Sequence, residues 1–248
     1  MNNKKGFTLI ELSIVLLILF LITGGIILGS KLIDNAKLYS LNKKFEYYKT
    51  AKVNFQLQFN YLPGDFNKAK VYWGDSAVNG NGNNLFHGHQ NPREWATNEL
   101  FAFWQHLSLS GTIDESYSGV SHNSQPYYML PGTNIPKFSK LGEKAGISFS
   151  YVSEFSPWVA STGAHYFAIG REVQNDTARD SVLTIKQALK FDQKFDDGAP
   201  DSGNVISALP GDPLSGECII SDGNGAYKYN LASDTAVAKC KIFYNADS

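Results

Sequence analysis

The first thirty residues hold one long apolar run between a basic start and a polar continuation. Lys4 and Lys5 precede Gly6, and from Phe7 onward the run to Ser30 carries a single charge, Glu11. A helix needs about twenty apolar residues to cross a bilayer, so this stretch predicts a membrane-spanning helix. A carboxylate inside such a span costs about 2.5–3.5 kcal/mol on insertion scales, which indicates that Glu11 has a partner or a function.

Beyond this run the pattern becomes amphipathic. Residues at alternating steps of four and three define one helical face, and only a lysine interrupts its apolar character. These positions are Leu41, Phe45, Tyr48, Lys52, Phe55, Phe59 and Leu62. Pro63-Gly64 ends the pattern, and no proline precedes it. We therefore predict one near-continuous helix from about Thr8 to Asn60, roughly 80 Å long. Two helices with a break near Gly29 are the alternative.

Shorter helices and strands are predicted after the long helix. Apolar spacing predicts a helix over residues 93–109, with Trp95 and Trp104 on its apolar side, and a short helix over residues 184–191. Alternation over residues 146–152 predicts a strand, and residues 166–170 form another apolar run. Residues 216–244 fit two or three strands, with a hairpin turn at Asp222-Gly223-Asn224-Gly225.

Composition narrows the function classes. The chain has 248 residues, which is enough for one globular head with its own core. Its formal net charge of -1 shows no nucleic-acid-binding footprint. The sequence contains no Cys-x-x-Cys, no Gly-x-Ser-x-Gly and no phosphate-binding loop, so nothing in it indicates an enzyme.

The basic leader and the junction Gly6-Phe7-Thr8-Leu9-Ile10-Glu11-Leu12 resemble the N-terminal signal of type IV pilins and type II secretion pseudopilins. The resemblance implies that a prepilin peptidase cuts between Gly6 and Phe7 and N-methylates Phe7. Glu11 is then the assembly glutamate. An ordinary secretory signal peptide is one alternative, but the run is long and lacks a small-x-small cleavage site. A plain single-pass anchor is the other, and it leaves Glu11 unexplained.

The same resemblance implies the layout, partners and location of the chain. Residues 1–6 are the leader, 7–30 the membrane and filament-core helix, 31–62 its amphipathic continuation, and 63–248 a periplasmic head. The expected fold is α+β, with an antiparallel sheet packed on the helical spine. The expected partners are prepilin peptidase, other pilin or pseudopilin subunits, the inner-membrane assembly platform and membrane lipid. The chain begins in the bacterial inner membrane and ends in a periplasmic or extracellular filament.

The charges and glycines of the apolar run are those expected of a segment that packs against other subunits in a filament. After cleavage the amino group of Phe7 is a cation within the membrane, and Glu11 of a neighbouring subunit can neutralise it. Gly24, Gly25 and Gly29 allow helices to approach closely in lipid, although each glycine costs about 1 kcal/mol relative to alanine. We predict that this segment packs closely or partly melts in a filament.

The two cysteines, Cys218 and Cys240, are expected to form one disulfide in an exported protein, worth about 3 kcal/mol. Many pilins close their C-terminal region in this way. Two free, buried thiols are the alternative.

Calcium is the most reasonable ligand, because some pseudopilin heads hold it in a C-terminal loop and it prefers oxygen ligands. No other cofactor is expected. The candidate ligands are Asp192, Asp196, Asp197 and Asp201, or Asp65 with Asn79, Asn81 and Asn83, or Asp212 with Asp222. Ordinary turn chemistry, in which Asn, Asp and Gly tolerate positive φ, is the more typical explanation of each cluster.

Other side chains give weaker signals. His87 and His89 are more typical of solvated loop residues than of a metal site, and Glu99 with His106 suggests a buried hydrogen-bonded pair. The tryptophans Trp73, Trp95, Trp104 and Trp158 suggest core packing rather than a sugar platform. Two functions remain: a structural subunit of a pilus or secretion pseudopilus, and an adhesin or carbohydrate-binding head displayed on a pilin stem.

Overall fold

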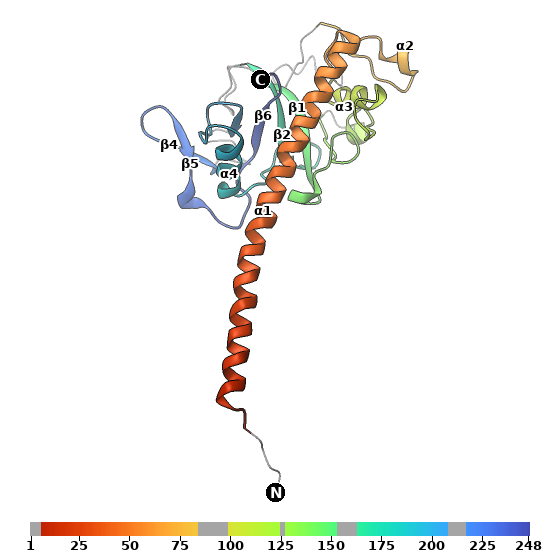
Figure 1. Cartoon of the computed structure of the whole chain (residues 1–248). Helices are drawn as coiled ribbons and strands as arrows, with labels where there is room; N and C mark the ends of the chain where they lie inside the picture. The colour runs from red at the N-terminus through yellow and green to blue at the C-terminus, as the bar shows by residue number, and fades with distance from the viewer. Residues whose placement is uncertain (1–5, 84–98, 125–126, 153–162, 208–216) are drawn as a thin grey trace. The chain divides into compact units, whose positions relative to one another are not determined.

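A computed structural model of the protein describes residues 6–83, 99–124, 127–152, 163–207 and 217–248 (Figure 1). Its first element is α1, Leu9–Phe59, a continuous helix of 51 residues. The single helix predicted from Thr8 to Asn60 is confirmed, and the helix has no break at Gly29. The helix ends where Asn60 adopts a left-handed conformation with φ 57°, three residues before Pro63.

The chain divides into two compact units, residues 1–40 and 41–248. In the first unit the described side chains from Phe7 to Ile26 are exposed, and most of them are apolar. Within the described residues, α1 is the one helix that is long and apolar enough to cross a membrane. Such a surface is suited to lipid or to other helices rather than to water.

A four-stranded antiparallel sheet forms the centre of the second unit. Its order is β1-β2-β6-β3, with β1 at Ala145–Val152, β2 at Ala164–Arg171, β6 at Ile242–Asn245 and β3 at Val205–Ser207. One row of buried side chains crosses all four strands, because Phe149 pairs with Phe167, Phe167 with Tyr244, and Tyr244 with Val205.

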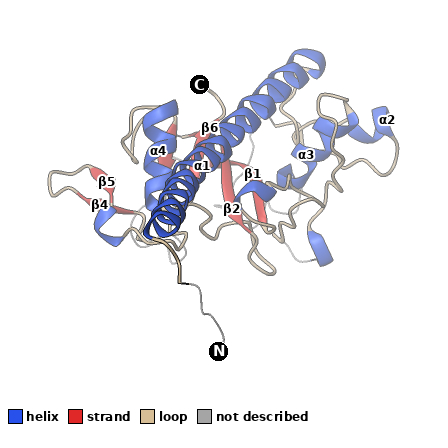
Figure 2. Ribbon diagram, turned by 60° about the horizontal axis from the view of Figure 1, so that its bottom comes forward, coloured by secondary structure: helices blue, strands red, loops and turns tan. Residues whose placement is uncertain are grey.

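The part of α1 after Ser40 packs on this row (Figure 2). The ring of Phe45 lies 5.0 Å from that of Tyr244 and 6.4 Å from that of Phe167. The predicted helical face from Leu41 to Leu62 is buried apart from the partly exposed Phe59. Each large apolar side chain buried in this way contributes about 1.5–3 kcal/mol.

The described residues of the second unit contain three further α-helices. The short α2 spans Ala69–Trp73, and α3 spans Glu99–Leu109 and stacks Phe103 on Phe149 with ring centroids 3.8 Å apart. The start predicted for α3, residues 93–98, lies outside the described residues. Helix α4, Ile185–Phe195, begins at a capping box formed by Thr184 and Gln187. It confirms the helix predicted at residues 184–191.

Near the end of the chain, β4 at Ile219–Ser221 pairs with β5 at Tyr227–Tyr229 as a separate hairpin. The predicted turn joins them, and the carboxylate of Asp222 accepts hydrogen bonds from the N–H groups of Asn224 and Ala226. The disulfide between Cys218 and Cys240 is present, with a Cα–Cα distance of 4.9 Å. Short 3-10 helices lie at His122–Ser124, Ser139–Leu141 and Leu231–Ser233. The predicted α+β fold, with a long helix followed by an antiparallel sheet, is confirmed.

Candidate functional sites

The junction between Gly6 and Phe7 lies in non-helical backbone immediately before α1. The side chain of Phe7 is 90% exposed. A peptidase binds its substrate as an accessible, non-helical segment, and a bond inside α1 would not offer one, because its backbone groups are hydrogen-bonded within the helix. The bond that the resemblance marks for cleavage is therefore accessible.

Glu11 caps the start of the helix. Its Oε2 accepts hydrogen bonds from the backbone N–H of Thr8 at 2.7 Å and from the Thr8 hydroxyl at 2.8 Å, and its own N–H donates to the Thr8 hydroxyl at 3.3 Å. This reciprocal arrangement is a capping box, and a carboxylate also suits the positive end of the helix dipole. Pairing of Glu11 with a neighbour's amino group stays a prediction. It requires Glu11 to exchange at least one of its hydrogen bonds with Thr8 for a contact with that amino group.

The three glycines of the apolar run have open space around them. Apart from the adjacent residues and the adjoining helix backbone, a Cβ added at Gly24, Gly25 or Gly29 would meet no atom within 4 Å. Since alanine would stabilise the helix by about 1 kcal/mol at each position, packing within the chain does not explain the glycines. Their close packing against other subunits stays a prediction.

Three carboxylates come together where α4 ends. The ligand atoms of Asp192, Asp196 and Asp197 lie within 4.8 Å of one another. Asp192 is fully buried, and its oxygens accept hydrogen bonds from the Tyr229 hydroxyl at 2.7 Å and from the N–H of Gly198 at 2.9 Å. Asp201 is not part of this group, and its carboxylate accepts the N–H of Tyr227 at 2.8 Å.

The other two carboxylates also order the following loop. Asp196 accepts the N–H groups of Asn204 and Val205, and Asp197 accepts the N–H of Ala199 and the hydroxyl of Ser202. Each carboxylate oxygen has two lone pairs, so these bonds leave coordination capacity. The three carboxylates therefore fit Ca²⁺, which takes oxygen ligands in flexible geometry.

The electrostatics of this cluster favour a cation. Burial raises the pKa of Asp192 to about 7, and the negative charges of Asp197 and Asp196 add to the effect. A divalent ion would remove both the repulsion and part of the desolvation penalty.

The remaining oxygen clusters hold turns. Asp65 accepts the N–H groups of Gly82 and Asn83 at 2.8 and 3.1 Å, and Asn79 accepts the N–H of Lys70. The side chain of Asn81 likewise accepts the N–H of Asn83. Asp212 lies outside the described residues, and Asp222 caps the β4–β5 turn. These contacts are those expected of turn chemistry.

His106 has a structural environment. It is fully buried, its Nδ1 accepts the N–H of Gly64 at 2.9 Å, and its Nε2 donates to the carbonyl of Val78 at 2.7 Å. Burial lowers the pKa of His106 to about 4, so the ring is neutral near pH 7. A hydrogen-bonded pair was predicted for Glu99 and His106, but each residue contacts the backbone of a neighbouring loop. Glu99 accepts the N–H of Asn81, and His106 contacts Gly64 and Val78.

The tryptophans show no exposed platform among the described residues. Trp104 is fully buried, and Trp73 packs against Phe59 with ring centroids 5.3 Å apart. His87, His89, Trp95 and Trp158 lie outside the described residues.

One cluster was not anticipated. Lys52 is only 4% exposed, and its ammonium donates to the carbonyl of Ala246 and to Asp247, both at 2.6 Å. Asp247 also accepts the backbone N–H of His165 at 2.9 Å and its ring Nδ1 at 2.8 Å. Burial alone would raise the pKa of Asp247, but the hydrogen bonds from His165 and Lys52 outweigh it and hold the pKa below its usual range. The lysine within the apolar face was the available signal for this cluster.

Residues 1–27 match the family described as the prokaryotic N-terminal methylation motif. The match covers Gly6, Phe7 and Glu11, together with Gly24 and Gly25. No curated protein and no solved structure matches the chain.

Proposed function

We propose that this chain, whose residues 1–27 carry the N-terminal signal of type IV pilins and pseudopilins, is a structural subunit of a pilin-type filament. The observation that carries the proposal is the methylation motif itself, placed on an accessible junction before a long helix whose first half is apolar. The signal marks the chain as a substrate of prepilin peptidase. Type IV pili and type II secretion pseudopili both use it.

The proposed mechanism needs no turnover. Cleavage after Gly6 leaves the amino group of Phe7 at the start of α1, and Glu11 of an adjacent subunit neutralises that charge. A subunit docked in the wrong register leaves both charges unpaired in a low-dielectric medium, so the cost of burial selects the correct register. The apolar surface of residues 7–26 then packs against other subunits instead of lipid.

The proposal places the chain first in the inner membrane, with α1 as its anchor and the head on the periplasmic side. The disulfide between Cys218 and Cys240 supports an exported head, because such bonds persist in oxidising compartments. The proposed partners are prepilin peptidase, other pilin-type subunits and the assembly platform that moves the chain from lipid into the filament.

The test is the mass of the N-terminal peptide of the membrane-bound chain, produced with and without prepilin peptidase. A methylated peptide that begins at Phe7, seen only with the enzyme, supports the proposal. Gly6→Val is the matched control, because its branched side chain at the cut should leave the leader in place. An intact Met1 terminus, or a cut near Ser30, would contradict the proposal.

We also propose that Asp192, Asp196 and Asp197 hold a structural calcium ion. Support comes from the closeness of their oxygens and from the raised pKa of Asp192. Millimolar calcium, but not the same concentration of magnesium, should raise the melting temperature of the detergent-solubilised chain at about pH 8. The double variant D196N/D197N should lose this rise, while D222N, in the β4–β5 turn, should keep it. No calcium-dependent rise in the unsubstituted chain would refute the site.

A further inference from the structure

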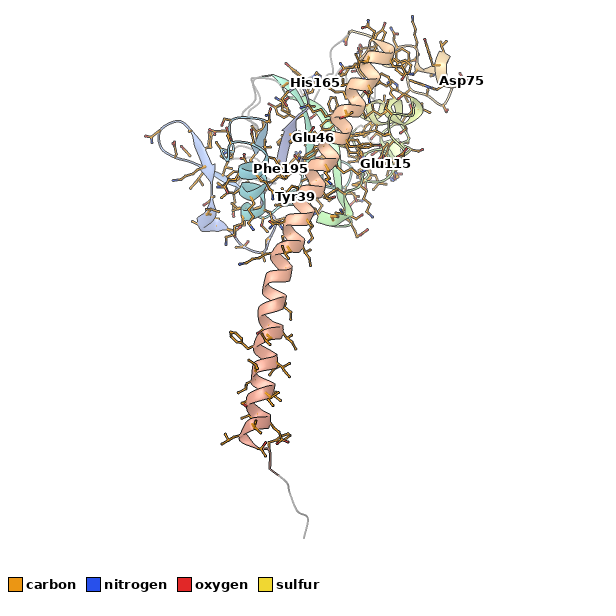
Figure 3. All side chains as sticks on the ribbon, in the orientation of Figure 1. Tyr39, Glu46, Asp75, Glu115, His165 and Phe195 are labelled. Carbon is orange, nitrogen blue, oxygen red and sulfur yellow. A yellow bond between two sulfur atoms is a disulfide. The ribbon has the colours of Figure 1, made fainter. Side chains whose placement is uncertain are left out.

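A polar pocket lies in the head where α1 ends. It has a volume of about 230 Å³ and is lined by Gln56, Asn60, Tyr61, Leu62, His165 and Asp247. His165 comes from β2 and lies beside α1 in Figure 3. Every one of these residues belongs to the second compact unit. The pocket therefore joins the end of the helix, the start of a strand and the residues after β6.

The lining offers both hydrogen-bond donors and acceptors. Gln56 and Asn60 contribute primary amides, each with two donors and an acceptor, and Tyr61 contributes a phenol that does both. Gln56 and Asn60 are exposed, and Tyr61 is partly exposed. A ligand in the pocket would replace water at these groups rather than displace packed side chains.

The pocket holds no unbalanced charge. Its one carboxylate, Asp247, is in an ion pair with Lys52 at 2.6 Å and is hydrogen-bonded to His165 at 2.8 Å. An anion would meet this carboxylate, and a cation would have to compete with an ammonium already in contact. Because the carboxylate and the ammonium already balance each other, neither an anion nor a cation gains a net Coulomb attraction there, so the pocket suits a neutral molecule.

The two aromatic rings of the lining are held in place before a ligand arrives. The ring of Tyr61 lies 5.4 Å from that of Phe66. The ring of His165 stacks on Phe149 with an angle of 1° between the planes. Groups that are fixed in advance lose little entropy when they bind.

We infer that this pocket binds a single neutral saccharide unit. A sugar ring presents hydroxyls that donate and accept, which matches two amides, a phenol and a carboxylate. Its apolar face can pack on the partly exposed ring of Tyr61. The volume lies below the roughly 300–1,000 Å³ of sites for larger ligands, so one sugar unit fits better than an extended glycan. This inference does not depend on filament assembly.

The test is saturation-transfer NMR on the full chain, in a detergent without a sugar headgroup. The probes are glucose, galactose, mannose and N-acetylglucosamine at tens of millimolar. We expect transfer to the ring protons of at least one sugar. In Gln56→Ala and in Tyr61→Phe the dissociation constant for that sugar should rise by tenfold or more. Gln58→Ala is the matched control, because Gln58 is exposed on the same helix and does not line the pocket.

Three outcomes would overturn the inference. The first is no transfer to any of the four sugars while near-ultraviolet circular dichroism shows a folded chain. The second is equal binding by Gln56→Ala and Gln58→Ala. The third is a shift of the His165 ring signals with inorganic phosphate or calcium chloride but not with sugar, which would reveal a site for ions. None of these outcomes alters the mass of the N-terminal peptide, so the filament proposal is tested separately.

Discussion

Lys52 interrupts an otherwise apolar helical face, and its ammonium is almost completely buried. Burying a charge is costly unless partners replace its water, and here a backbone carbonyl and the carboxylate of Asp247 do so. The aliphatic part of the side chain still packs with its apolar neighbours. One residue therefore continues the apolar face and attaches the residues that follow β6 to the helix.

Replacing Lys52 with methionine should show how much these contacts contribute to the free energy of unfolding. Methionine keeps the aliphatic stem but leaves the carbonyl of Ala246 without its buried donor, so we expect the free energy of unfolding to fall by about 1–3 kcal/mol. Urea denaturation followed by tryptophan fluorescence measures the change. Lys49→Met is the control, because Lys49 makes only an exposed hydrogen bond to Ser248 and should cost less than about 0.5 kcal/mol. Equal losses in both variants would contradict the role given to Lys52.

Glu11→Leu should separate processing from assembly. The cut site at Gly6 and Phe7 is untouched, so we expect normal cleavage and methylation. Without the carboxylate the neighbouring amino group has no partner, so we expect the variant to be missing from sheared filaments. The readouts are peptide mass and filament immunoblots, and Glu11→Gln tests whether the charge rather than the shape is needed. Normal incorporation of Glu11→Leu would disprove the pairing.

For single residues, the sequence indicated those with a local signal and missed those whose partners are distant along the chain. Glu11 stood out because a charge in an apolar run is rare. His106 bonds to backbone 42 and 28 residues away, and Lys52 to residues 194 and 195 positions away. The spacing of residues within a short stretch of sequence cannot predict hydrogen bonds between residues so far apart, so only the fold reveals them.

The glycines of α1 affect the surface of a whole helix rather than a single site. Changing Gly24, Gly25 and Gly29 together to leucine should leave membrane insertion and cleavage intact, since each Cβ has open space. We expect the amount of the chain in filaments to fall, because bulky side chains keep helices apart. The control is a triple variant at apolar positions, Val15→Leu with Ile18→Leu and Ile22→Leu. Normal assembly of the variant with leucine at Gly24, Gly25 and Gly29 would contradict close packing at the glycines.

Elements with a long pattern or a capping signal were predictable. The spacing from Leu41 to Leu62 identified the second half of α1, and alternation identified β1. Thr184 and Gln187 form a capping box whose Thr-x-x-Gln spacing is visible in the sequence. The strand β3, Val205–Ser207, was not predicted. Three residues are too few to show a period, and this strand exists because it pairs with β6.

Two buried titratable groups give the whole head opposite responses to pH. The pKa of Asp192 is raised to about 7 from an ordinary value of 3.8, so its contribution to stability is complete at low pH and is lost as the pH rises through 7. The pKa of His106 is lowered to about 4 from 6.5. Its contribution is complete above pH 6.5 and is lost as the pH falls toward 4.

Asp192→Asn should isolate the first of these responses. An amide cannot ionise, so the melting temperature of the variant should improve relative to the unsubstituted chain as the pH rises from about 4 to 7. The measurement is a thermal melt of the full chain in a calcium chelator at several pH values. D222N, at an exposed turn, should show a constant difference. A constant difference for Asp192→Asn as well would show that burial of this carboxyl has no thermodynamic effect.

The arrangement of the whole molecule was predictable only in outline. The pattern and the resemblance together predicted a long helix and, after it, an antiparallel sheet, and this layout is confirmed. The order β1-β2-β6-β3 did not follow from the sequence, because it places β6, near the end of the chain, between β2 and β3. Strand order depends on long-range pairing, which local patterns do not contain.

The β4–β5 turn has a practical consequence for visualising the protein. Under the proposed processing, a tag placed before Gly6 would be lost with the leader, and changes near Asp247 would disturb its bonds to Lys52 and His165. The turn at Asp222–Gly225 is exposed, so residues can be inserted there without burying them, whereas Gly223 and Gly225 themselves, with φ of 86° and 97°, are best left unchanged. Exposed loop tips tolerate insertions, so a short epitope in this turn should make single subunits visible by immunogold microscopy without preventing export.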